Sequence, residues 1–188
     1  MNLRQLPNAI SIARMFLVVP VVLSLLQLKF GTALVWIAVA GVSDGIDGFL
    51  AKHYGWQSRL GSILDPLADK LLLVSTFITL TWLGLVPLWL LVAVLARDLL
   101  IVIGGVVFHI TLGRFDMQPS RISKLNTVVQ ILFVLAVVFF HGDFALVPWV
   151  LEALAYITLA TTVVSGIDYV WVWGRKAMKI MREKKLSH

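Results

Sequence analysis

Long hydrophobic runs, separated by short polar or Gly/Pro-containing breaks, cover most of this chain. The runs extend over about residues 8–28, 32–53, 62–83, 86–111, 122–141 and 147–171. Each is close to the roughly 20 apolar residues that an α-helix needs to cross a bilayer. The pattern therefore predicts an all-α fold: an integral membrane bundle of six transmembrane helices that forms a single domain, residues 1–188.

Composition agrees with this pattern. Hydrophobic residues make up 60% of the 188 positions and charged residues 14%, which is unlike an ordinary soluble domain. The chain has no cysteine, which excludes disulfides and thiolate metal sites.

Positive charges are concentrated at one side of the predicted membrane. The net charge is +6, and much of it lies in a basic tail: Arg175, Lys176, Lys179, Arg182, Lys184 and Lys185. Such a tail can bind nucleic acid, but directly after a membrane span it more often flanks the cytoplasmic face beside anionic lipid. We expect both termini to be cytoplasmic, membrane lipid to be a partner, and nucleic acid not to be one.

Four aspartates interrupt the apolar pattern: Asp44, Asp47, Asp65 and Asp69. The first two lie near the predicted cytoplasmic end of the second span, and the other two open the third span on the same side. Spacings of three and four residues place each pair on one helical face. We expect the two faces to meet, so that four carboxylates converge near the cytoplasmic boundary.

Carboxylates so close together need cations, because each raises the pKa of its neighbours. Mg²⁺ or Mn²⁺ suits an oxygen-only ligand set, and two such ions can stabilise both the entering and leaving oxygens of a phosphoryl transfer. The alternative is a buried structural charge cluster. Nearby glycines have two interpretations: Gly41 and Gly45 fit either close helix packing or ligand room, whereas Gly48 and Gly61 favour ligand room.

These residues form a longer pattern, Asp44-x2-Asp47-Gly48-x2-Ala51-Lys52-x8-Gly61-x3-Asp65-x3-Asp69. The pattern resembles the signature of the CDP-alcohol phosphatidyltransferases, and the length and six-span layout are similar too. Lys52 departs from the family, which usually has Arg there. The replacement keeps the charge but loses the planar two-pronged donor.

The resemblance implies a reaction in which an alcohol attacks the lipid-side phosphate of a CDP-linked lipid and CMP leaves. It implies that Asp44, Asp47, Asp65 and Asp69 bind the metal ions and that Asp69 is the general base. It also implies a CDP-lipid site formed by Gly48, Ala51, Lys52 and Gly61. Family members are commonly homodimers, and we extend that expectation to this chain.

The flanking residues bear on the acceptor alcohol. Asp65-Pro66-Leu67-Ala68-Asp69-Lys70 is similar to the branch of phosphatidylglycerophosphate and cardiolipin synthases, while Arg97-Asp98 and the segment around Asn126 resemble the cardiolipin enzymes. This resemblance implies CDP-diacylglycerol as donor and phosphatidylglycerol as acceptor, with glycerol 3-phosphate as the alternative. The candidate ligands for the acceptor phosphate are Arg97, Arg121 and Lys124. Arg97 lies within a span and can form an ion pair with its neighbour Asp98. Arg121 and Lys124 can equally be ordinary positive charges that flank the cytoplasmic face.

A divalent-cation transporter is a more distant hypothesis, because intramembrane carboxylates often mark ion paths. The clustering of the acids at one face and the lack of an inverted repeat speak against it. The first residues lack the Arg- and Ser-rich pattern of a mitochondrial presequence. We therefore expect a bacterial inner membrane, with the active site facing the cytoplasm.

Overall fold

A computed structural model of the chain describes residues 6–55, 61–112, 120–142 and 148–186. Within these ranges, the side chains of residues 6–7, 51–52, 62–63, 108–109, 111–112, 148 and 176–186 are not described.

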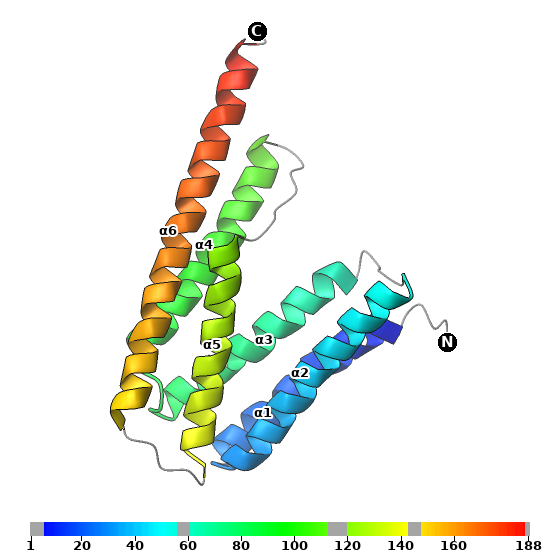
Figure 1. The fold of residues 1–188 in the computed structure, drawn as a ribbon, viewed down its shortest axis with the longest axis vertical. Coiled ribbons are helices and arrows are strands. Elements are labelled where there is room, and N and C mark those ends of the chain that lie inside the picture. Colours follow the sequence, from blue (N-terminus) through cyan, green and yellow to red (C-terminus); the bar gives the residue numbers. More distant parts are fainter. Residues whose placement is uncertain (1–5, 56–60, 113–119, 143–147, 187–188) are drawn as a thin grey trace. The chain divides into compact units, whose positions relative to one another are not determined.

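Six α-helices account for nearly all of the described residues, and no strand occurs among them, which confirms the all-α prediction (Figure 1). Every predicted helix end except the last lies within two residues of the observed end. The helices are α1 (Leu6–Leu26), α2 (Phe30–His53), α3 (Gly61–Trp82), α4 (Leu88–Leu112), α5 (Arg121–Phe140) and α6 (Pro148–Leu186).

The exception is the end of α6: the helix continues to Leu186, although its apolar stretch ends at Arg175, close to the predicted span end near residue 171. Hydropathy marks where the apolar stretch ends, not where the helix ends. The basic tail contains no proline and is rich in Lys, Arg, Met and Glu, all good helix formers, so the backbone has no local reason to leave the helix.

Five helices are long and apolar enough to cross a membrane: α1, α2, α4, α5 and α6. Large apolar side chains remain exposed on them, among them Phe16 at 71% and Val35 at 60%, as expected of a surface that faces lipid rather than water. The remaining helix, α3, carries Asp65, Asp69 and Lys70 in its first turns, which shortens its uncharged stretch. Whether α3 crosses the bilayer stays a prediction.

The described chain divides into two compact units. Unit 1 comprises residues 1–86 and 134–147, and unit 2 comprises residues 87–133 and 148–188. In unit 1, α1 packs against both α2 and α3 (Figure 1). The buried face of α1 contains Ser11, Arg14, Val21 and Leu25 at helical spacing, and small residues such as Ala40 on α2 allow a close approach. The polar residues Ser11 and Arg14 thus lie among the buried positions of α1, as does Ser24.

Gly84 ends α3. Its φ of +74° lies in the left-handed region that favours glycine, and the N–H of Leu85 turns back to donate to the Leu80 carbonyl at 2.9 Å. This turn leads into α4, where unit 2 begins.

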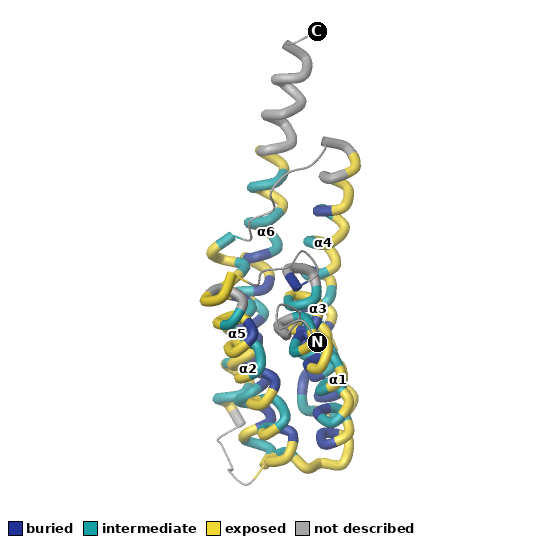
Figure 2. The backbone as a smooth tube through the Cα atoms, turned by 90° about the vertical axis from the view of Figure 1, so that its right-hand side faces the viewer, coloured by how far each residue is buried: buried dark blue, intermediate teal, exposed yellow. Residues whose placement is uncertain are grey.

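In unit 2, α4 and α6 run parallel and stay in contact over several turns. Trp89 stacks on Tyr156 with ring centroids 5.5 Å apart, and further along the Tyr169 hydroxyl donates to the Ile101 carbonyl at 3.0 Å. Figure 2 shows buried segments alternating with exposed ones along these helices. The close approach at Tyr169 depends on Gly104, because a Cβ there would lie 3.0 Å from the tyrosine ring.

A buried polar group joins α5 to α6. The Thr162 hydroxyl donates to the Asn126 side-chain oxygen at 3.0 Å, and the Gln130 amide donates to the Thr162 hydroxyl at 3.3 Å. All three side chains are almost fully buried. Hydrogen bonds of this kind hold helices together inside a bilayer, where apolar contact alone provides little specificity.

Gly104→Leu tests the α4–α6 packing. We expect it to lower the free energy of unfolding by about 1–3 kcal/mol, because the larger side chain forces the Tyr169 ring out of place. Gly41→Leu on α2 is the matched control, since a Cβ at Gly41 meets no heavy atom within 4 Å. Thermal unfolding in detergent measures both variants, and equal midpoints would contradict the packing described here.

Candidate active site

The four aspartates of the sequence pattern lie on α2 and α3, as predicted, but differ in exposure. The Asp47 side chain is 2% exposed, whereas those of Asp44 and Asp69 are 48% and 52% exposed. Asp65 is intermediate. One acid is therefore held inside the unit, while its neighbours reach its surface.

Arg14 on α1 connects the two acidic faces. Its Nη1 donates to Asp44 Oδ1 and to Asp69 Oδ1, each at 2.7 Å, and its Nη2 donates to Asp47 Oδ2. The side chain of Arg14 is only 1% exposed. Because Asp44 and Asp69 share one nitrogen, their oxygens lie within twice that distance of each other, although they belong to different helices.

Asp65 is held in a similar way by the same helix. The Ser11 hydroxyl, one turn before Arg14, donates to Asp65 Oδ1. All four acids are therefore bonded to neighbouring positions of α1. The expected convergence of the acids occurs, but α1 mediates it, since α1 is the helix that packs against both α2 and α3.

One guanidinium balances only one of the four carboxylates, so the cluster retains a strong attraction for further cations. Among the described residues, no three acidic or histidine side chains are arranged as metal ligands. One oxygen each of Asp44, Asp47 and Asp69 is bonded to Arg14 instead. The donor set itself is chemically suited to Mg²⁺ or Mn²⁺, and the half-exposed Asp44 and Asp69 have room to turn.

The glycines beside the acids leave open space. A Cβ built at Gly41, Gly45 or Gly48 would meet no heavy atom within 4 Å. Among the described residues of this chain, nothing packs against these three positions. Gly61 is buried at the start of α3, and Ala51 and Lys52 lie outside the described side chains.

The candidate acceptor ligands all belong to unit 2. Arg97 is buried and pairs with Asp98 at 2.7 Å, as expected from the sequence. Its other nitrogens donate to Ser165 on α6, at 2.7 Å for the shorter contact, and to Ser123 on α5 at 2.6 Å. Arg97 thus ties α4 to both neighbouring helices of its unit. Arg121 and Lys124 are exposed at the start of α5.

Sequence reasoning missed Ser11 and Arg14. A signal for Arg14 was present, because an ionisable residue inside an apolar span generally has a functional partner. Ser11 carries no comparable signal, since a serine in a membrane helix can bond to its own backbone.

Comparison with known proteins identifies the family. A sequence model of the CDP-alcohol phosphatidyltransferases matches residues 4–164, and the chain belongs to this family. The family is generally dependent on divalent metal ions.

Three relatives illustrate the similarity. "Cardiolipin synthase (CMP-forming)" of Rattus norvegicus is 33% identical over 95% of this chain and 64% of its own length. The protein of the same name in Streptomyces coelicolor is 41% identical over 64% of this chain and 57% of its own length. A "Probable phosphatidylglycerophosphate synthase" of Mycobacterium tuberculosis is 36% identical over 71% of this chain and 61% of its own length. The chain therefore spans less than two thirds of the length of these relatives.

Arg14→Gln tests the role of the buried guanidinium. We expect the free energy of unfolding to fall by about 3 kcal/mol in the presence of chelator, because Asp47 is left buried without its counter-charge. Arg14→Lys keeps the charge but not the two-pronged geometry, so its loss should be smaller.

The measurement is thermal unfolding of the purified protein in detergent, with exposed Lys29→Gln as the control for losing a positive charge. A midpoint for Arg14→Gln equal to that of Lys29→Gln would show that Arg14 does not hold the cluster together.

Proposed function

We propose that this protein is a membrane-embedded cardiolipin synthase that transfers a phosphatidyl group from CDP-diacylglycerol to phosphatidylglycerol. The observation that carries the proposal is the convergence of Asp44, Asp47 and Asp69 on one guanidinium, in a member of this family. The relatives named cardiolipin synthase support the acceptor. The relative named phosphatidylglycerophosphate synthase keeps glycerol 3-phosphate as the alternative acceptor.

Two divalent ions, Mg²⁺ or Mn²⁺, are proposed to be held by Asp44, Asp47, Asp65 and Asp69. When bound, they supply positive charge to the diphosphate and so stabilise the charge that develops during phosphoryl transfer. Arg14 and Ser11 keep the four carboxylates in one place before the ions arrive. Gly48 and Gly61, with Ala51 and Lys52, are proposed to form the CDP-lipid site, where the open space beside Gly48 admits a bulky nucleotide.

Asp69 is proposed to be the general base. Its half-exposed carboxylate can reach a ligand at the surface of unit 1 and accept the proton of the acceptor hydroxyl. The hydroxyl oxygen then forms a bond to the phosphorus beside diacylglycerol, and the bond from that phosphorus to the CMP oxygen breaks. The products are cardiolipin and CMP.

Arg121 and Lys124 are proposed to bind the acceptor phosphate, since both are exposed cations on the first turn of α5. Arg97 has a revised role in this proposal. Its nitrogens are bonded to Asp98, Ser123 and Ser165, so it orders the start of α5, from which Arg121 and Lys124 extend.

We also propose a homodimer in a bacterial cytoplasmic membrane, with both termini and the active site on the cytoplasmic side. The Streptomyces relative supports a bacterial source, and the placement of Lys and Arg supports the orientation.

An assay with labelled CDP-diacylglycerol identifies the acceptor. We expect phosphatidylglycerol to yield labelled cardiolipin and CMP in the presence of Mg²⁺ or Mn²⁺, and chelator to stop the reaction. Product formed only with glycerol 3-phosphate would overturn the acceptor, whereas turnover that is indifferent to chelator would overturn the metal site.

Two substitutions separate the roles of the acids. Asp69→Asn should lower kcat by about 10²–10⁴-fold while largely sparing CDP-lipid binding, because the amide cannot accept the proton. Asp44→Ala should lose both turnover and binding.

Turnover and displacement of a labelled CDP-lipid measure the two quantities, and the exposed Glu152→Gln on α6 is the matched carboxylate-to-amide control. If Asp69→Asn turned over as fast as Glu152→Gln, another group would have to be the base.

A further inference from the structure

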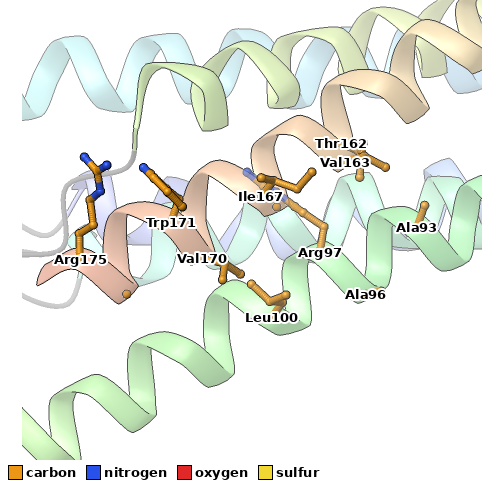
Figure 3. A pocket seen from close by; sticks show the side chains of 12 residues that line it. Ala93, Ala96, Arg97, Leu100, Thr162, Val163, Ile167, Val170, Trp171 and Arg175 are labelled. Carbon is orange, nitrogen blue, oxygen red and sulfur yellow. The ribbon is translucent and has the colours of Figure 1, made fainter. Parts of the chain in front are cut away.

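Unit 2 contains an apolar groove between α4 and α6 with a cavity volume of about 640 Å³ (Figure 3). Small side chains leave the space that forms the groove: Ala93 and Ala96 on α4, and Gly166 and Gly174 on α6. Larger apolar side chains border it, including Ile167 at 64% and Val170 at 56% exposure. The groove is therefore open along its length to whatever surrounds unit 2.

The position of the groove along α6 matches one leaflet of a bilayer. The apolar stretch of α6 extends over Trp149–Arg175, and the groove reaches from Thr162, in the middle of that stretch, to Arg175 at its end. These residues are separated by about 20 Å of helix rise. Half of a bilayer with its head groups is also about 20 Å thick. One end of the groove thus lies at the membrane surface and the other near the mid-plane.

Arg175 lies at the end of the groove that is near the membrane surface. The guanidinium carbon of Arg175 lies 4.5 Å from the centroid of the Trp171 ring, and both residues are exposed lining residues of the groove (Figure 3). The stacked ring orients the guanidinium and leaves its N–H groups available in its plane. Tryptophan and arginine at a span end are suited to the head-group region.

The other charges nearby do not cancel this cation. Arg97 also lines the groove, but its guanidinium is bonded to Asp98, Ser123 and Ser165, so it contributes mainly its aliphatic stem. Asp168 on α6 lines a smaller hollow that shares Ile167 and Trp171 with the groove, but Asp168 is not among the lining residues of the groove itself. Of the two cations among the described lining residues, Arg175 is therefore the one that sets the charge at the mouth of this groove.

We propose that this groove binds one phospholipid with a monoanionic phosphodiester head group, whose phosphate lies on Arg175 and whose acyl chain lies between α4 and α6. Charge complementarity at the mouth and an apolar channel that reaches the mid-plane select a lipid over a free phosphate. The lining residues of the groove all belong to unit 2 and include none of the four aspartates, and the proposal does not rest on the proposed transfer reaction. The lipid would be retained by the protein whether or not the chain performs that reaction.

Native mass spectrometry of the delipidated full-length protein tests the site by titration with phosphatidylglycerol. We expect Arg175→Ala to weaken the tightest lipid by about fivefold, because one interfacial cation is lost. Gly174→Leu should weaken it at least as much by filling the mouth, and a Cβ at this position meets no heavy atom within 4 Å. Arg182→Ala removes the same charge further along the tail and should have no effect on this lipid.

The same titration is repeated with two comparison ligands, phosphatidylcholine and glycerol 3-phosphate. Phosphatidylcholine should bind more weakly than phosphatidylglycerol, and glycerol 3-phosphate should show no Arg175-dependent binding. Equal affinity for the two lipids, equal losses in Arg175→Ala and Arg182→Ala, or Arg175-dependent capture of glycerol 3-phosphate would each overturn the proposal. So would a shift from dimer to monomer in Gly174→Leu, which would identify the groove as an interface between copies. This experiment measures lipid binding and not turnover. A negative result would therefore overturn the lipid site without bearing on the proposed transfer reaction, which the acceptor assay tests.

Discussion

A buried guanidinium shared by carboxylates from two other helices is the interaction on which unit 1 depends. Arg14 lies on the contact face of α1 and bonds Asp44, Asp47 and Asp69. Like-charged carboxylates on α2 and α3 would otherwise repel each other, and in an apolar medium that repulsion is poorly screened. Arg14 therefore brings the three carboxylates together, with one positive charge shared among them.

The chemistry of the chain divides between its two units. Unit 1 carries the acids and the glycines that leave space beside them. Unit 2 carries the cations Arg121 and Lys124, and its Arg97 is already bonded to three partners. Acids suit metal ions and a diphosphate donor, whereas cations suit the phosphate of an acceptor. The proposed transfer of a phosphatidyl group to an anionic acceptor would use both kinds of site, and the chain belongs to the CDP-alcohol phosphatidyltransferase family.

Some local features could be predicted because they depend on neighbours in the sequence. Helix ends followed from where apolar runs stop, and the pairing of Arg97 with Asp98 followed from adjacency. The helix α6 continues beyond its apolar span for a physical reason: apolar character and helical backbone are different properties, and the basic tail keeps the second without the first. Asn126 on α5 is buried against Thr162 on α6. The residues next to Asn126 in the sequence do not indicate this contact, because its partner lies on another helix.

The sequence by itself determined the all-α class, the apolar length of the spans and the spacing that puts each acid pair on one helical face. Hydrophobicity and helical periodicity are local properties, and they suffice for these conclusions. Only the tertiary structure decided that α1 packs against both acidic helices and that Arg14 and Ser11 meet the carboxylates. It also decided that small residues on α4 and α6 leave a groove. Such contacts join residues distant in the chain, and which faces meet depends on how all side chains pack at once.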